Sequence, residues 1–475
     1  MVPLKNLFRN TDRYEYILIM FLLIWGLWIF RSASWLITEM SNPAMNIKRI
    51  IIGCSIAIIS GAGGAFLLFL SKKVCNTWVL PIIIFSIAFL IRLGYIILIP
   101  TRPQLDFLVY HTMALQFSGG DFHSFYARPM GYPLLLSMLY RLYPAPAMGR
   151  ILNVIFSTFT VVLVYQIGRA VENKSLGLTA AFLLAVYPAD IMMTSVLATE
   201  PAATFFLTFA LFGLIQVLSQ PRLSLTISLI GLMLAFAVIL RTAFLNYPIG
   251  FALATGWFER QNKKMMFYKL SAFMLSFLIV IFIFLVICAH LVGSFSLKPL
   301  SSNVSYFPFL SGTGEIVNVT FAKDSKMYFS WPEKERERLA IKTAFNRIYL
   351  NPLRFMKIAG KKIDIMFSSD GYAPMWSFYT VKTRFTKIQQ TTLWLSFRIW
   401  AQLMKLIMLI LGILGLVYLW QTKRRLFWIL VFLVILTGLP HIILEAQGRY
   451  RHQLNPEMAI LAAGGVQMLW CRFGG

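Results

Sequence analysis

The sequence has few charged residues, and among these acidic residues are much rarer than basic ones. Charged residues make up 13% of its 475 residues, and 18 acids stand against 44 bases, which gives a formal net charge of +26. Soluble domains carry about twice that charged fraction. With 58% hydrophobic and 15% aromatic residues, the chain exceeds what a soluble core can bury, so its composition indicates an integral membrane protein.

Cysteine is also scarce. The four cysteines are scattered singly in or beside apolar runs, so the sequence offers neither a CxxC metal pair nor a disulfide framework. No His/Cys cluster indicates a metal, although a divalent ion stays open as an alternative. Because no nucleic-acid motif accompanies the positive charge, we expect partners among anionic lipids and phosphate groups and no nucleic acid.

Long apolar runs are what the chain has in abundance. About 20 apolar residues span the hydrocarbon as a helix, and the short alternating segments of an outer-membrane barrel are missing. We therefore predict an all-α polytopic membrane protein with about twelve transmembrane helices. The expected spans are 16–37, 49–70, 79–99, 147–168, 175–189, 197–218, 223–240, 244–257, 270–291, 397–419, 426–443 and 455–471.

Basic connectors predict how these spans lie across the membrane. The segment before the first span is basic, and so is the turn with Lys72 and Lys73, which places both on the cytoplasmic side. Three crossings then put the polar loop 100–150 on the outer side. The same rule places the long polar segment 292–392 outside and both termini in the cytoplasm, as expected for a multi-pass protein of the plasma (inner) membrane.

The loop 100–150 holds two acids, Asp106 and Asp121. A carboxylate at the rim of a bilayer is usable as a general base. The stretch LDFLVYHTMALQFSGG predicts a short interfacial helix with Asp106, Tyr110, Met113 and Phe117 on one face, ended by its glycines. A second short helix is expected at GYPLLLSMLYRLYP. Asp106 is a candidate base or simply a favourable charge at a helix N-terminus, and Asp121 is expected to be a turn residue.

Ionisable residues inside apolar runs are costly and mark polar interiors or binding sites. Arg92 and Arg241 lie near expected outer helix ends, where they could extend to the interface or bind substrate. Glu200 precedes Pro201 where a helix is expected to start, so it is either a cap or a substrate contact, and we expect the contact.

A basic outer turn is predicted just before the last span. Arg449, Tyr450 and Arg451 crowd this turn. Two guanidinium groups there would suit a lipid-linked phosphate, and anchoring to lipid headgroups is the alternative.

An ordered series of segments resembles the GT-C superfamily of polyprenyl-phosphate-sugar-dependent glycosyltransferases, in particular the bacterial branch of protein mannosyltransferases and aminoarabinose transferases. The resemblance covers most of the chain from about Pro81 onward. Its segments are IRLGYIILIPTRPQLDFLVYHTMA, GYPLLLSMLY, GRILNVIFSTFTVVLVYQIGRAV, LLAVYPADIMMTSVLATEPAATFF, ERLAIKTAFNRIYLNPLRFMKIAGKK and GRYRHQLNPEMAILAAGG.

This resemblance implies roles for particular residues. In similar enzymes an acid of the first outer loop acts as base, a role that falls on Asp106. Many relatives carry an Asp-Glu pair there, whereas here Phe107 follows, so the second acid has no counterpart. Glu200 matches the acidic position after the YP segment, and Arg449 to Arg451 match the basic outer turn.

The resemblance also implies a GT-C-like division of the chain. Residues 1–78 would form an extra N-terminal transmembrane hairpin, and 79–291 a catalytic module that contains the loop 100–150. Residues 292–392 would form a small outer cap, whose second half has helical periodicity. Residues 393–475 would form the C-terminal helices.

The expected function is transfer of one sugar from a polyprenyl-phosphate carrier to a glycan, lipid or protein acceptor at the outer face, with inversion by analogy to the superfamily. An acceptor needs a base, and the departing phosphate needs positive charge. Asp106 would supply the first, and Arg449, Arg451 and Lys361 or Lys362 the second. A glycan polymerase or ligase is the nearer alternative. A transporter or flippase typically shows matched halves, which are not visible here, and a non-catalytic lipid-binding scaffold would depend on no single acid.

Overall fold

The computed structural model describes the chain from Glu15 to Phe473, and nearly all of the predicted spans lie within it. It leaves undescribed 43, 74–78, 123–127, 220–223, 301–305, 315–318, 379–380 and 382–386 as well as both ends. The basic N-terminal segment and part of the first cytoplasmic turn therefore lie outside the described residues. A helix lies over most of each predicted span. These helices are α1 (Glu15–Met40), α2 (Ile47–Lys73), α3 (Val79–Leu98), α6 (Pro146–Val171), α7 (Lys174–Ala185), α9 (Glu200–Ser219), α10 (Ser224–Leu240), α11 (Asn246–Phe258), α12 (Lys263–Val292), α18 (Lys387–Thr422), α19 (Arg424–Ile443) and α20 (Asn455–Phe473).

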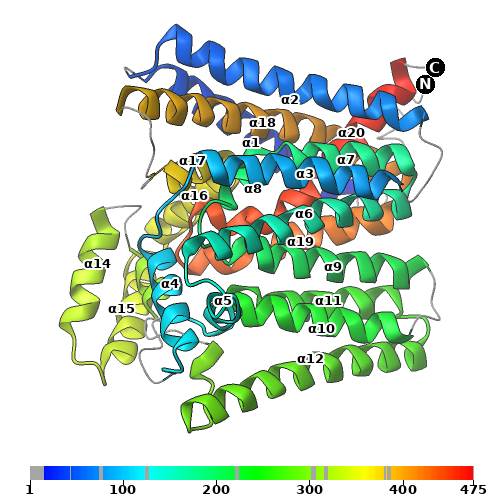
Figure 1. The fold of residues 1–475 in the computed structure, drawn as a ribbon. Coiled ribbons are helices and arrows are strands. Elements are labelled where there is room, and N and C mark those ends of the chain that lie inside the picture. Colours follow the sequence, from blue (N-terminus) through cyan, green and yellow to red (C-terminus); the bar gives the residue numbers. More distant parts are fainter. Residues whose placement is uncertain are drawn as a thin grey trace.

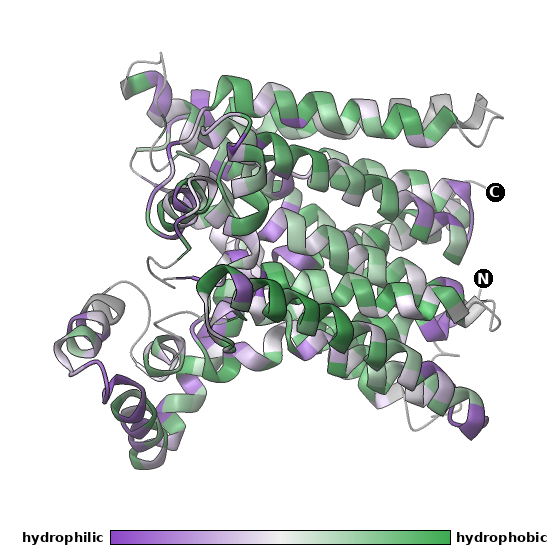
Figure 2. Cartoon of the chain, turned by 60° about the horizontal axis from the view of Figure 1, so that its bottom comes forward, coloured by the Kyte–Doolittle hydropathy of each residue, from purple (hydrophilic) through white to green (hydrophobic). Residues whose placement is uncertain are grey.

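The helices form one bundle, with the start of α1 and the end of α20 at one end and α4, α5, α14 and α15 at the other (Figure 1). Hydrophobic residues run along the helices, and hydrophilic residues gather toward their ends (Figure 2). Within the described residues, seven helices are long and apolar enough to cross a membrane. The chain therefore has the helices of a multi-pass membrane protein.

The expected count of about twelve spans is not confirmed by these seven. Helix α7 has 12 residues and α11 has 13. At 1.5 Å per residue, α7 is roughly 18 Å long, well short of a hydrocarbon core about 30 Å thick. The predicted run 175–189 fails as a single span because Pro188 starts a new helix, α8 (Pro188–Met193).

Helix α18 is the longest element, and it organises one side of the bundle. It packs against α1, α2 and α20. The contact with α20 is close because glycines meet there: a Cβ on Gly415 would overlap the backbone oxygen of Leu461, and one on Gly465 would overlap that of Leu411. Small residues allow such an approach between membrane helices. The predicted extra hairpin, α1 and α2, thus packs against the C-terminal helix α18.

The short helices predicted in the first outer loop are confirmed. Helix α4 (Asp106–Ser118) ends at Gly119, and Gly120 follows at φ 87°, a left-handed conformation that glycine adopts freely. Helix α5 (Gly131–Tyr140) packs against α4. On α4, Met113 and Phe117 are buried, as the predicted face requires.

The predicted cap contains helices, and its second half is helical as the periodicity indicated. Arg347 of α15 donates to Asp324 of α14 at 2.7 Å, and α16 packs against α19 and α1. The cap is therefore attached to the bundle through α16. Its elements are η3 (Lys298–Leu300), α13 (Phe307–Gly312), α14 (Val319–Ser330), α15 (Arg336–Leu350), α16 (Pro352–Ser368) and α17 (Tyr372–Phe378).

Candidate active site

Five helix ends and turns bring charged side chains together at the end of the bundle that carries α4 and α5. Asp106 is the first residue of α4 and Glu200 the first of α9, and Arg241 directly follows α10. Arg128 precedes α5, and Arg449 lies in the 3-10 turn η4 (Gly448–Leu454). Because backbone groups at helix ends are unpaired and irregular, charged residues collect there more readily than within a span.

Asp106 lies between two guanidinium groups. Arg449 Nη2 donates to its Oδ2 at 2.7 Å, and Arg128 Nη2 contacts its Oδ1. The carboxylate side chain remains 28% exposed. Burial raises the pKa of Asp106, but the charges and hydrogen bonds of Arg449 and Arg128 outweigh it and lower the pKa to about 2. Asp106 is therefore fully ionised and held by both arginines at neutral pH.

The residue before Asp106 has an unusual backbone. Leu105 has φ 49°, the left-handed region that side chains larger than glycine rarely adopt. Such conformations cost about 1–3 kcal/mol and persist only where the surroundings impose them. The chain therefore enters α4 under strain at the point that aims the Asp106 carboxylate.

Arg449 is enclosed by rings and polar groups. Its Cζ lies 5.5 Å from the Phe107 ring, 5.2 Å from Trp376 and 5.4 Å from Tyr450. Its Nε donates to Gln447 at 2.9 Å. Burial alone would lower the pKa of this guanidinium, yet the negative and phenolic groups around it raise its pKa above the ordinary value. The Arg449 guanidinium is therefore positively charged, and its surroundings hold its planar group in one orientation.

A second ion pair lies beside the first. Arg241 Nη1 is 2.9 Å from Glu200 Oε1 and donates to Thr199 Oγ1 at 3.1 Å. Arg449 Nε lies 3.8 Å from the same Glu200 oxygen, which links the two pairs. The Arg241 guanidinium also lies 5.2 Å from the Tyr450 ring centre. Four of the predicted site residues thus share one cluster with Asp106: Glu200, Arg241, Arg449 and Tyr450.

Tyr110 stands one turn beyond Asp106 on α4 and packs edge-on against Tyr132 at 5.5 Å. Burial, followed by the charge of Asp106, raises the pKa of Tyr110 to about 12. Its hydroxyl is therefore protonated at neutral pH and available as a hydrogen-bond donor beside the carboxylate.

Arg451 does not join this cluster, contrary to the expectation that it would bind phosphate with Arg449. It is fully buried and forms an ion pair with Asp370, which also accepts from Tyr187. Its Nη1 donates to Asn455 at 3.0 Å. In a 3-10 turn, residues two apart point about 120° away from each other, so the two arginines of the GRYR turn face different aspartates.

Arg92 is also separate from the cluster. It is fully buried, and its Nε donates to Ser157 at 2.7 Å and its Nη1 to the backbone oxygen of Ala185 at 3.0 Å. The expectation that it could extend to the interface is wrong, because α3 packs against α6 and α7 and its side chain points into that contact.

The two cap lysines lie on different faces of α16. Lys361 is exposed, and Lys362 is buried with its ammonium donating to three backbone oxygens: Gly312 at 2.8 Å, Ile442 at 2.7 Å and Leu444 at 3.0 Å. Burial lowers the pKa of Lys362 to about 8. Lys362 therefore ties the cap to the end of α19, and the structure places neither lysine at Asp106.

Sequence reasoning missed Arg128 and the buried acids. Arg128 stands in the aromatic stretch FYARP just before the second loop helix, so its place in the same polar loop as Asp106 was a usable signal. Asp370 lies in the polar turn SSDGY between α16 and α17, where no neighbouring residue in sequence indicates a buried partner. Within the described part of the chain, no group of three or more His, Cys, Asp or Glu could hold a metal ion.

Comparisons with known proteins give only distant likenesses. No protein-family model matches the chain, and no curated protein sequence matches it. Three solved structures of the Archaeoglobus fulgidus oligosaccharyltransferase are similar in shape. The apo form is 16% identical with a TM-score of 0.49, covering 82% of this chain and 51% of that one. The form tethered with an acceptor peptide containing the NVT sequon is 15% identical with a TM-score of 0.48, covering 84% and 50%.

The third structure is the archaeal oligosaccharyltransferase AglB from the same organism in complex with an inhibitory peptide and a dolichol-phosphate. It is 15% identical, with a TM-score of 0.47, and the match covers 83% of this chain and 51% of that one. The chain therefore spans about half the length of these structures. At this level of similarity the likeness assigns neither a family nor an activity to the chain.

Proposed function

We propose that the chain is a membrane glycosyltransferase that moves a single sugar from a polyprenyl-phosphate carrier to an acceptor at the outer membrane face, with inversion. The observation that carries this proposal is the Asp106 carboxylate held between Arg128 and Arg449 at a bundle end. The same place offers a base for an acceptor and cations for a phosphate, the two groups that this transfer needs.

The reaction uses these groups in one displacement. The acceptor hydroxyl or amine attacks the anomeric carbon and gives its proton to Asp106. The bond between that carbon and the phosphate oxygen breaks, and its electron pair stays on the phosphate. Arg449 and Arg128 stabilise the charge that develops there, where fixed donors act most strongly because they need no reorganisation.

The resting ion pairs set the order of events. With a pKa of about 2, Asp106 is a weak base while both arginines hold it. A phosphate competes for the same guanidinium forks, because these bind phosphate as well as carboxylate. As donor phosphate takes Arg449 and Arg128, the Asp106 carboxylate loses the charges that depress its pKa and becomes a stronger base. Asp106 would thus become an effective base only once the donor has bound.

The neighbouring residues complete the proposed site. Glu200 and Arg241 would contact the donor sugar or its phosphate from the start of α9, and Tyr110 and Tyr450 would line the same space. Arg451, buried against Asp370, would hold the turn that carries Arg449. The cap would contact the acceptor.

The test is transfer from a purified polyprenyl-phosphate sugar by the enzyme in detergent. Asp106→Asn keeps the size of the side chain and removes its basicity, so turnover should fall by roughly 100- to 10,000-fold. Asp121→Asn is the matched control, because Asp121 is an exposed carboxylate at the other end of α4. Near-normal turnover of folded Asp106→Asn would remove Asp106 as the base.

Product size separates this proposal from a polymerase or ligase. Mass spectrometry of the acceptor should show the addition of one sugar unit, whereas a chain of units would support the polymerase.

A further inference from the structure

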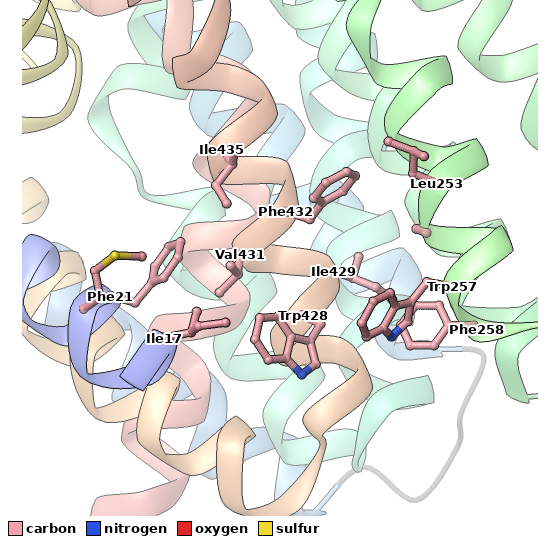
Figure 3. A pocket seen from close by; sticks show the side chains of 12 residues that line it. Ile17, Phe21, Leu253, Trp257, Phe258, Trp428, Ile429, Val431, Phe432 and Ile435 are labelled. Carbon is pink, nitrogen blue, oxygen red and sulfur yellow. The ribbon is translucent and has the colours of Figure 1, made fainter. Parts of the chain in front are cut away.

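Three helices border an apolar cavity, and none of the residues that line it belongs to the charged cluster. The cavity lies between α1, α11 and α19 and has a volume of about 430 Å³, within the range of ligand-binding pockets. Figure 3 shows α1 and α11 on its two sides, with side chains of α19 between them. Its lining includes Ile17 and Phe21 of α1, Leu253 and Trp257 of α11, and Phe432 and Ile435 of α19.

The cavity opens toward the surroundings of the bundle. Leu253 is 60% exposed and Trp257 53% exposed, although both line it. In a membrane, the surrounding medium at such a position is lipid acyl chain. An acyl chain can enter here without passing through the bundle.

Helices α11 and α19 are in close contact between the cavity and the candidate active site. Asn246, at the start of α11, donates to the backbone oxygen of Leu436, late in α19, so these two helices run antiparallel. Between that level and the cavity, a Cβ on Gly250 would overlap Leu436 and lie 3.1 Å from Phe432. The two helices therefore touch at Gly250, between the cavity and the charged cluster.

The far end of the cavity is basic. Trp257, Phe258 and Trp428 lie at that end in Figure 3. Arg260 Cζ is 4.9 Å from the Trp257 ring centre, and Arg425 lies one turn before Trp428 on α19 and is exposed. Lys423 and Arg424 stand at the same start of α19, and Lys263 and Lys264 begin the next helix, α12.

The acids beside this rim are already paired. Glu259 accepts from Lys269 at 2.5 Å, and Glu172 lies 3.2 Å from Lys423. Arg260 and Arg425 therefore add positive charge that these acids do not offset. The rim combines tryptophans with arginines, the combination expected where a protein meets lipid headgroups.

We propose that this cavity binds an anionic phospholipid, with one acyl chain between α1, α11 and α19 and the headgroup phosphate on Arg260 and Arg425. The basic helix ends place it in the leaflet expected to be cytoplasmic, where anionic lipids are enriched. The apolar lining takes the chain, and the arginines discriminate the headgroup. This site is independent of glycosyl transfer.

Native mass spectrometry of the delipidated protein tests the proposal directly. Titration with dioleoyl phosphatidylglycerol should give one tightly bound lipid, and phosphatidylcholine with the same chains should bind far more weakly. Each basic residue near an anionic headgroup contributes a roughly fivefold gain in binding. The double variant Arg260→Gln, Arg425→Gln should therefore lose affinity for phosphatidylglycerol by roughly 25-fold.

Two further variants complete the test. Ala254→Phe fills the cavity and should reduce binding of both lipids. If this variant does not fold, the double variant Arg260→Gln, Arg425→Gln is sufficient to test the proposal. Arg338→Gln is the matched control, because it removes an exposed arginine on the cap helix α15 and should leave binding unchanged.

Three results would overturn the proposal. Equal retention of the two lipids would show that the arginines recognise no headgroup. Unchanged binding by the double variant would show that the lipid binds at another site. Displacement of phosphatidylglycerol by polyprenyl phosphate would make the cavity part of the donor site.

Discussion

Arg449 and Arg451 stand two residues apart in one turn, and each is paired with an aspartate, yet their surroundings are opposite. Arg449 meets the Asp106 side chain, which is 28% exposed, whereas the side chains of Arg451 and Asp370 are both 0% exposed. An accessible pair can exchange partners with an arriving anion. A pair sealed in the interior cannot, and breaking it leaves a buried charge. Similar residues therefore form an accessible ion pair in one place and a sealed one in the other, and we propose a binding role for the first and an architectural role for the second.

Removing the interior arginine should have the largest effect, and on folding. Arg451→Met leaves Asp370 buried without its cation, which typically costs about 3–5 kcal/mol. Thermal unfolding in detergent should show a strongly lowered Tm or little folded protein. Adding Asp370→Asn removes the orphaned charge and should recover part of the loss. A stable Arg451→Met protein would contradict the architectural role.

Removing the accessible arginine should affect catalysis more than folding. Arg449→Ala takes away the proposed donor to the leaving phosphate, so kcat should fall by roughly 100- to 1,000-fold. Arg449→Lys should lose less, because it keeps the charge without the planar fork. Both variants should elute as folded protein, with kcat measured per folded enzyme. Normal turnover by the alanine variant would take this turn out of the active site.

The pH dependence of stability should report the accessible pair. A depressed carboxyl pKa stabilises the fold above the unfolded value near 4, and this contribution is lost as pH falls toward the folded value of about 2. Wild type should therefore lose about 2 kcal/mol relative to Asp106→Asn between about pH 4 and pH 2. Thermal unfolding of both proteins over this range measures the difference, and parallel curves would show that the ion pairs add no stability.

The exposed lysine of the cap should have the smallest effect. Lys361→Gln changes an exposed side chain, so kcat and Tm should stay at wild-type values. Lys362→Gln, on the next position of α16, removes three bonds to backbone oxygens and should lower Tm. Equal behaviour of the two variants would refute this assignment.

The sequence predicted elements better than it predicted side-chain directions. Apolar runs and the glycines after α4 determine local structure, so a helix lies over each expected span and both loop helices form. The cluster of Asp106, Glu200, Arg241 and Arg449 could also be anticipated, because charges in apolar surroundings need partners.

The directions of Arg92, Lys362 and Arg451 depend on contacts between residues far apart in the chain. Arg451 meets Asp370 only because a 3-10 turn rotates it away from Arg449. Nothing in the local pattern encodes that rotation. Helix length limited the span count in a similar way, since apolar composition says that a run is buried but not that it crosses a bilayer.

The glycine contact between α18 and α20 bears on the position of the turn η4, which carries Arg449. Helix α20 begins at Asn455, directly after η4, so a shift of α20 against α18 would move this turn and Arg449 with it. One methyl group on Gly415 or Gly465 would push the two helices apart. How closely the Arg449 guanidinium approaches Asp106 would therefore depend on glycines in the apolar interior, roughly 15 Å along the helix from the turn.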